Sequence, residues 1–203
     1  MIGILCPSIF ERKALDAARL KRAGACMEVS GMGKIRSLLG CLRLYEKHPR
    51  LDGILLIGFA GGLTEDLAVG DVIEPDVFVE QDYCAEPFEK FPNRIKFAKR
   101  PLLVSGSRRA AMLTQDRFLT ENPYKTGEAG FHFSTVACDM ESYAVAKFCL
   151  EKNKRFAVVK LISDVADANA DHDFLASCRR LAPKLNHTVL AAAAAFGKMK
   201  GRG

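Results

Sequence analysis

The sequence predicts an α/β fold in three layers, α/β/α, with helices on both faces of a central mixed, mostly parallel sheet. Short apolar runs alternate along the chain with segments of helical periodicity, which is typical of this class. In the run Ile54–Ile57 the apolar residues are consecutive rather than alternating, as in strands that are buried on both faces. Both observations favour a parallel sheet between two layers of helices.

Length and composition predict one globular domain that spans residues 1–203. The chain has 203 residues, of which 49% are hydrophobic, and it shows no linker or internal repeat. No apolar run approaches the roughly 20 residues that cross a bilayer, and the N-terminus lacks a basic segment followed by an apolar one. We therefore expect a cytoplasmic protein that does not associate with membranes.

The seven cysteines and the positive charge have simple interpretations. The cysteines form no C-x-x-C pair, which favours reduced thiols over disulfides or a structural metal site. His172 lies between two aspartates, a cluster that is more typical of a helix start than of a metal site. The net charge is +6, but basic residues are scattered among acidic ones. We expect no nucleic-acid partner.

In the first third of the chain, the residues Ile2–Leu5 predict a strand and Ser8 with Glu11 forms a capping box at the start of a helix that reaches about Arg22. A second strand is expected over Cys26–Val29. The helix that follows carries an apolar face, which we expect to pack on the sheet, with a subunit interface as the alternative. The residues of this face are Ile35, Leu38, Leu39, Leu42 and Tyr45.

In the middle of the chain, the pattern predicts a buried strand that ends in a glycine-rich turn, two further strands, a long irregular segment, a fourth strand and a weakly helical region. These elements are Gly53–Phe59 with the turn at 58–62, Val69–Ile73, Val77–Val79, Glu80–Arg100, Leu102–Val104 and a region to Asn122.

In the last third, two strands alternate with two helices, and Asp139 is expected to be the N-cap of the first helix. The expected elements are a strand over Thr135–Cys138, a helix to about Lys152, a strand over Phe156–Ile162, and a helical segment from Asp171 to about Lys198 with a kink or restart at Pro183.

Three carboxylates follow predicted strands closely: Glu11, Glu141 and Asp164. In α/β sheets ligands bind beyond the carboxyl ends of the strands, so these side chains are candidates for one site. Each also has a structural reading. Glu11 can close the capping box, Glu141 can favour a helix N-terminus, and Asp164 can begin a turn.

The chain resembles the nucleoside phosphorylase and methylthioadenosine/S-adenosylhomocysteine nucleosidase superfamily, over nearly its whole length and in the same order of motifs. The segments that carry the resemblance are Ile2–Leu5 with Glu11, Ser30–Lys34, Gly58–Leu63, Val69–Ile73, Asp139–Ser142 and Ile162–Asp167. The last two are the most specific.

The resemblance implies a role for each matching residue. Glu11 matches the base that activates water, Asp164 the acid that protonates purine N7, and Glu141 the carboxylate that binds the ribose hydroxyls, with Met140 against the sugar. The substrate-binding set is completed by Ser163, Phe59, Ala60 and Gly61. Breaking a C–N glycosidic bond places positive charge on the ribose and negative charge on the base, so a proton donor lowers the barrier without a metal or cofactor.

The sequence departs from the family pattern at four places. Phe59 stands where a small hydroxyl residue is usual, and Lys160 stands where an arginine is usual. The chain is shorter than expected over 16–29 and 81–102, and no base-stacking aromatic follows Ser105-Gly106.

The function expected from the resemblance is a purine nucleoside N-ribosyl hydrolase acting on methylthioadenosine or S-adenosylhomocysteine. The resemblance also implies a homodimer. Three alternatives stay open. One is a phosphorylase, for which residues 31–34 are part of a candidate anion pocket. The others are a hydrolase of another adenosyl or futalosine-type nucleoside, and a nucleoside-binding relative without activity.

Overall fold

The computed structural model describes residues 1–83, 93–98, 101–122 and 133–199. The strands in chain order are β1 (Ile2–Cys6), β2 (Ala25–Val29), β3 (Gly53–Gly62), β4 (Val72–Ile73), β5 (Val77–Glu80), β6 (Arg94–Lys96), β7 (Ala111–Thr114), β8 (Val136–Asp139) and β9 (Arg155–Asp164). The helices are α1 (Ile9–Ala14), α2 (Ala17–Arg22), α3 (Lys34–Lys47), α4 (Ser142–Glu151), α5 (Ala170–Arg180) and α6 (Ala182–Lys198).

The strands form one mixed, mostly parallel sheet. Its main order is β2-β1-β3-β8-β7-β5-β6, and β9 pairs with both β3 and β4. The antiparallel pairs are β3 with β8, β4 with β9 and β5 with β6, while the other pairs are parallel. The predicted fold class is confirmed.

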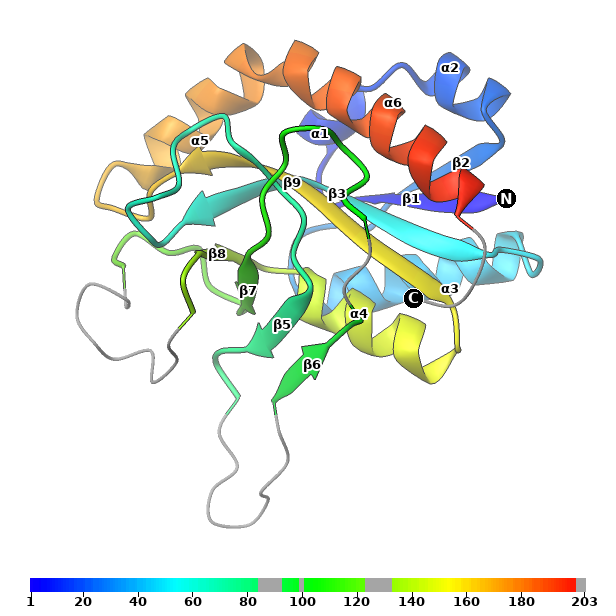
Figure 1. Cartoon of the computed structure of the whole chain (residues 1–203), viewed down its shortest axis with the longest axis horizontal. Coiled ribbons are helices and arrows are strands. Elements are labelled where there is room, and N and C mark those ends of the chain that lie inside the picture. The colour runs from blue at the N-terminus through cyan, green and yellow to red at the C-terminus, as the bar shows by residue number, and fades with distance from the viewer. Residues whose placement is uncertain (84–92, 99–100, 123–132, 200–203) are drawn as a thin grey trace.

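Helices cover both faces of this sheet. Figure 1 shows α1, α2, α5 and α6 on one face and α3 and α4 on the other. Successive side chains of a strand point to opposite faces, so the apolar run of β3 serves both layers. Ile54 and Leu56 join the core beneath α3 and α4, whereas Leu55 and Ile57 join the core beneath α6.

One edge of β3 is shared by two different strands. On the other edge, β9 pairs with β3 from Gly53 to Gly61. On the shared edge, β1 pairs with residues 53–56 and β8 pairs with Gly61 and Gly62. Within the described residues no strand pairs with this edge between Leu56 and Gly61. The sheet therefore opens beside the carboxyl end of β3.

The N-terminal helix is shorter than the sequence predicts. The capping box of Ser8 and Glu11 is present, but α1 ends at Ala14 and Leu15 has an extended backbone. Asp16 then accepts the N–H of Arg19 and caps a separate helix, α2. The strong preference of aspartate for the N-cap position explains the restart.

The glycine-rich segment at 58–62 is not a turn, because β3 continues through it to Gly62. Of the kink or restart predicted at Pro183, the structure has the restart: α5 ends at Arg180 and α6 starts at Ala182, with Pro183 in its first turn. Glu141 rather than Asp139 is the N-cap residue of α4, although the Asp139 carboxylate still accepts the N–H groups of Glu141 and Ser142.

The strand expected over Leu102–Val104 is absent, and the strand of this region is β7, which lies in the segment expected to be weakly helical. Instead of a neighbouring strand, the buried carboxylate of Glu74 accepts the hydrogen bonds of the segment around Leu103. It accepts the N–H groups of Leu103 and Val104, both at 2.9 Å, and the hydroxyl of Ser107 at 2.7 Å. Of the segment 80–100, the described part contains β6 and the last residue of β5, Glu80, while 84–92 and 99–100 lie outside the described residues.

Four of the five residues of the apolar face of α3 do not pack on the sheet as predicted, whereas Tyr45 is half-buried and packs against the core. Ile35 is 72% exposed, and Leu38, Leu39 and Leu42 are exposed as well. The face that contacts the sheet carries three small residues, Ser37, Gly40 and Cys41, beside Leu44, and Gly40 lies so close to Ser30 that a Cβ would come within 2.6 Å of its side chain. Small residues allow this close approach, so the larger apolar residues point away from the sheet.

Six of the seven cysteines lie in described residues, and all six are free thiols. Five of them are buried, as expected for thiols that fill an apolar core. No helix within the described ranges has both the length and the apolar character required to span a bilayer.

We predict that Glu74→Gln lowers the free energy of unfolding by about 1–3 kcal/mol, because an amide cannot accept all the hydrogen bonds that the carboxylate accepts. Chemical denaturation followed by circular dichroism measures the change. Glu65→Gln is the matched control, because Glu65 is exposed. Equal midpoints for the two variants would contradict the assigned role of Glu74.

Candidate active site

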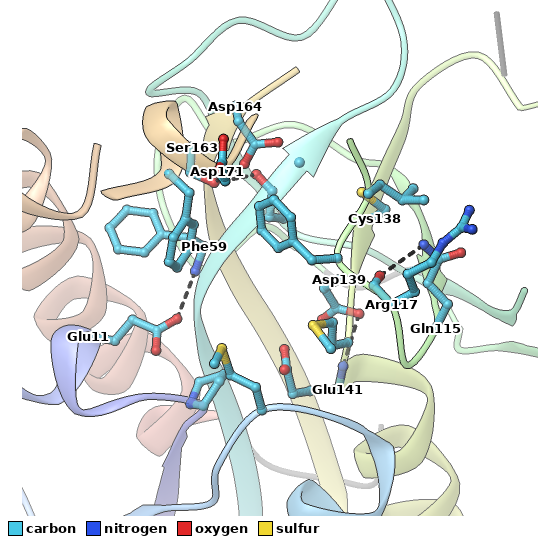
Figure 2. A pocket seen from close by; sticks show the side chains of 18 of the residues that line it. Glu11, Phe59, Gln115, Arg117, Cys138, Asp139, Glu141, Ser163, Asp164 and Asp171 are labelled. Carbon is cyan, nitrogen blue, oxygen red and sulfur yellow. Dashed lines mark hydrogen bonds between the residues drawn. The ribbon is translucent and has the colours of Figure 1, made fainter. Parts of the chain in front are cut away.

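A cavity of about 400 Å³ lies where the sheet opens beside β3 (Figure 2). All eight residues that the sequence predicts for the site line this cavity. They are Glu11, Phe59, Ala60, Gly61, Met140, Glu141, Ser163 and Asp164. They come from α1, from the end of β3, from the start of α4 and from the end of β9. The expected convergence of separate segments at one site is therefore observed in the geometry.

Glu11 performs its structural role and lines the cavity at the same time. Its Oε2 accepts the N–H of Ser8 at 2.7 Å and the Ser8 hydroxyl, while its Oε1 accepts the N–H of Phe59 at 3.2 Å. Phe59 lies in the unpaired stretch of the β3 edge, which leaves its N–H available for this bond. Burial raises the pKa of Glu11, and the attraction of Lys160 and the hydrogen bonds from Ser8 and Phe59 offset only part of this effect.

Gly58 makes room for this carboxylate. Its φ is +140°, a conformation that favours glycine, and a Cβ at this position would lie 2.3 Å from Oε1 of Glu11. The glycine of the motif is therefore required by the close approach of Glu11 to the strand.

Glu141 and Asp139 share one buried cation, Lys160. The ammonium of Lys160 lies 3.0 Å from Oε2 of Glu141 and 3.1 Å from Oδ2 of Asp139, and its side chain is 0% exposed. Burial by itself lowers the pKa of Lys160, but the attraction of Glu141, Asp139 and Glu11 outweighs it, so the pKa is raised and the ammonium stays charged. Burial also raises the pKa of Glu141, against the attraction of Lys160.

Asp164 lies at the end of β9 and is 3% exposed. Its Oδ2 accepts the Ser163 hydroxyl at 2.6 Å and its Oδ1 accepts the N–H of Ala166 at 3.1 Å. Burial raises the pKa of Asp164 more than these two hydrogen bonds lower it, and the nearby charges of Asp173 and Asp167 raise it further. The carboxyl group therefore holds its proton to a higher pH than an ordinary aspartate. Figure 2 shows Glu11, Glu141 and Asp164 on three sides of the cavity.

Three phenylalanines line the cavity in a continuous row. Phe174 of α5 contacts Phe59 edge to face at 6.1 Å between ring centres, and it contacts Phe118 in the same way at 5.8 Å. The Phe59 side chain is buried at the position where the family usually has a hydroxyl, so this part of the wall is apolar.

Several lining residues were missed by sequence reasoning. They are Pro7, Met32, Gln115, Arg117, Phe118, Leu119, Cys138, Asp139, Asp171, Phe174 and Leu175. No aromatic residue was found after Ser105-Gly106 in the sequence, whereas the structure has an aromatic side chain at the cavity, Phe118, which follows β7. An apolar run at 110–113 that ends at Thr114 was the available signal, because a strand there places the next residues at the cavity.

The turn that precedes α3 directs its backbone donors at carboxylates. The N–H of Gly33 donates to Oε1 of Glu141 at 3.3 Å, and the N–H of Lys34 donates to Oδ1 of Asp116 at 2.7 Å. The Lys34 ammonium lies within 2.8 Å of Glu80 and 2.6 Å of Asp82. This segment is therefore engaged with acidic groups of the protein itself.

Relatives in sequence include 5′-methylthioadenosine/S-adenosylhomocysteine nucleosidases of several bacteria. A 5′-methylthioadenosine/S-adenosylhomocysteine nucleosidase of Shewanella sediminis is 28% identical over 163 residues, which cover 71% of this chain and 70% of that protein. The enzyme of the same name from Geobacillus thermodenitrificans is 26% identical over 177 residues, 78% of this chain and 74% of that protein.

Solved structures share the fold over almost the whole chain. Futalosine hydrolase of Helicobacter pylori superimposes with a TM-score of 0.79 at 20% identity, covering 94% of this chain and 96% of that one. A 5′-methylthioadenosine/S-adenosylhomocysteine nucleosidase from S. pneumoniae, solved with a transition-state inhibitor, gives 0.78 at 22% identity, with 96% and 99% covered.

The sequence profile described as the phosphorylase superfamily matches residues 17–195, which is most of the chain. The order of motifs, the three-layer fold and this match agree with one another. The chain belongs to the phosphorylase superfamily.

Proposed function

We propose that this chain hydrolyses the N-glycosidic bond of a purine nucleoside, with Asp164 as the acid and Glu11 as the base. The observation that carries the proposal is that Glu11, Glu141 and Asp164, which come from separate elements, are all buried and line one cavity. Its relatives in sequence are named as nucleosidases, which supports the same reaction class.

Asp164 supplies the proton that the departing base needs. As the C1′–N9 bond breaks, its electron pair passes to the purine, and a proton delivered to N7 neutralises the charge that develops there. The raised pKa of Asp164 favours the protonated form that this step requires. Ser163, whose hydroxyl donates to Oδ2 of Asp164, orients the carboxyl group.

Glu141 binds the two ribose hydroxyls, and Met140 packs against the sugar. A carboxylate accepts two neighbouring hydroxyl groups well, and the attraction strengthens as positive charge develops on the sugar. Lys160 holds Glu141 in place and favours its charged form.

Glu11 takes a proton from the attacking water, whose oxygen forms the new bond to C1′. The products are the free purine base and the free sugar. Both oxygens of Glu11 already accept hydrogen bonds from Ser8 or Phe59, which fix the orientation of the carboxylate toward the cavity. The geometry of this base is thus set before substrate binds.

Water is favoured over phosphate as the nucleophile. A phosphate site needs free donors and positive charge. The donors of Gly33 and Lys34, which were the candidates from the sequence, are engaged by carboxylates. Among the described lining residues Arg117 is the only cation, and Figure 2 places it on the opposite side of the cavity from Glu11.

Methylthioadenosine and S-adenosylhomocysteine are the first substrates to consider, because the relatives in sequence carry these names. A futalosine-type nucleoside is the second candidate, since the fold is equally similar to futalosine hydrolase of Helicobacter pylori. Retention of all three carboxyl groups at the cavity argues against a binding protein without activity, in spite of Phe59.

The decisive experiment is to incubate the purified chain with methylthioadenosine, S-adenosylhomocysteine, futalosine, adenosine and inosine, with and without phosphate, and to quantify free base by chromatography. Release without phosphate supports the hydrolase. Release that requires phosphate supports the phosphorylase, and tight nucleoside binding without release supports the inactive relative.

We predict that Asp164→Asn lowers kcat by about 10²- to 10⁴-fold, the usual contribution of a general acid. Asparagine keeps the size of the side chain but has no proton to deliver to N7. The matched control is Asp16→Asn. Asp16 is exposed and is not among the residues that line the cavity, and asparagine is an equally good N-cap residue. Near-normal turnover of Asp164→Asn would exclude Asp164 as the acid.

A bell-shaped pH profile is expected. Burial raises the pKa of Asp164, so its acid form, and with it kcat, is lost as the pH rises through that raised value. Burial also raises the pKa of Glu11, so its base form is lost as the pH falls through that value, which lies above that of an ordinary glutamate. In the residual activity of Asp164→Asn the alkaline limb should disappear while the acid limb remains. Initial rates across the pH range provide the measurement, and an unchanged alkaline limb would contradict the assignment.

We further propose that the protein is a cytoplasmic homodimer that associates through the exposed apolar face of α3. Ile35, Leu38, Leu39 and Leu42 form a stripe without charge, and a two-fold axis lets such a stripe cover itself. Leu39→Glu should therefore give a monomer by light scattering. Leu102→Glu, at another exposed leucine, should keep the mass of the wild type. A wild-type monomer would overturn the dimer.

A further inference from the structure

Lys34 joins three segments that surround the cavity. Its ammonium lies 2.8 Å from Oε1 of Glu80 at the end of β5 and 2.6 Å from Oδ1 of Asp82, and 3.9 Å from Oδ2 of Asp116 after β7. The Lys34 side chain is only 17% exposed, so water screens these contacts less than at the surface. A single cation is thus surrounded by three carboxylates from two other segments.

Backbone hydrogen bonds join the same three segments, which contain Lys34, Asp82 and Asp116. Oδ1 of Asp116 accepts the N–H of Lys34 at 2.7 Å, and the N–H of Asp116 donates to Oδ2 of Asp82 at 2.9 Å. Asp116 therefore caps the first turn of α3 from outside, because the N-cap residue Gly33 has no side chain to do so. The residues that follow Asp116 are Arg117 and Phe118, which line the cavity.

The turn before α3 also contacts Glu141. The N–H of Gly33, next to Lys34, donates to Oε1 of Glu141, while Lys160 contacts Oε2 of the same carboxylate. Both oxygens of Glu141 are thus held, one by Lys160 and one by the turn that Lys34 anchors. Displacement of this turn removes one of the two groups that orient Glu141.

We propose that Lys34 is a positioning residue for nucleoside binding, which rests on the proposed function. It does not touch the substrate. Its ammonium fixes the turn before α3 against the segments that contain Asp82 and Asp116, and so sets where Gly33 holds Glu141 and where Phe118 forms the wall. Removal of the ammonium leaves Glu80, Asp82 and Asp116 to repel one another, and the segments move apart.

A second lysine in the same helix shows what an ordinary surface pair looks like. Lys47, in the last turn of α3, lies 2.9 Å from Glu28, but its side chain is 58% exposed. Exposed pairs of this kind contribute little to stability. Lys47→Met is therefore a matched control for Lys34→Met, with the same change of charge and size in the same helix.

The test measures kcat and KM by base release, and hydrogen–deuterium exchange without nucleoside, for both variants. For Lys34→Met we expect kcat/KM to fall roughly 10- to 100-fold, mainly through KM, since misplacement by about 1 Å can cost about 10²-fold. Exchange should rise over residues 30–35 and 115–119. Lys47→Met should match the wild type in all three measurements, and Lys34→Arg, which keeps the charge, should recover most of the lost affinity.

Unchanged KM and unchanged exchange in Lys34→Met would overturn the proposal, as would lower thermal stability with wild-type kinetics, which indicates a structural role alone. If Lys34→Met does not fold, Asp82→Asn removes one partner of the ammonium and should shift KM and exchange in the same direction by less. If the wild type releases no base from any nucleoside, the proposed function fails, and the exchange comparison still decides whether Lys34 orders the two segments.

Discussion

The hydrogen bonds of β3 with three other strands set the positions of Glu11, Glu141 and Asp164 at the cavity. On one edge β9 follows β3 to Gly61 and brings Asp164 to its end. On the other edge the pairing of β3 with β1 ends at Leu56 and its pairing with β8 begins at Gly61. Among the described residues the stretch of this edge between them is unpaired, and the elements that carry Glu11 and Glu141 meet across it. A buried N–H must find an acceptor, and in this stretch the Phe59 N–H finds Glu11. The same gap thus creates the cavity and orients one of its acids.

Charge balance is the second constraint. Lys160 is the buried cation that Glu141 and Asp139 share, and Glu11 also contributes to its raised pKa. Breaking such a buried pair typically costs about 3–5 kcal/mol, because the remaining charge is left without a partner. An ammonium can direct its donors to two different carboxylates, whereas the planar fork of arginine suits a single carboxylate better. Lysine therefore fits the arrangement at this position.

The motifs of the sequence were sufficient to predict the fold class and residues that meet at one cavity, because strand ends in an α/β sheet converge. Local detail was harder to predict. The run of residues 110–113 that leads into β7 is apolar without alternation, a pattern that short strands and buried helices share, so Phe118 was missed. The periodicity of α3 showed that one face is apolar but not what covers it. The close approach at Gly40, which turns that face outward, depends on tertiary contacts.

Gly58 shows that the site depends on the absence of a side chain as much as on the groups that are present. A single methyl group at this position would occupy the space of Oε1 of Glu11, while the hydrophobic run of β3 and all three acids stayed intact in the sequence. Inactive members of such a family can thus arise without the loss of any chemical group. A survey of related chains for function should therefore include this glycine beside the acids. A chain in which it is replaced can keep all three carboxyl groups and still lack the geometry that orients Glu11.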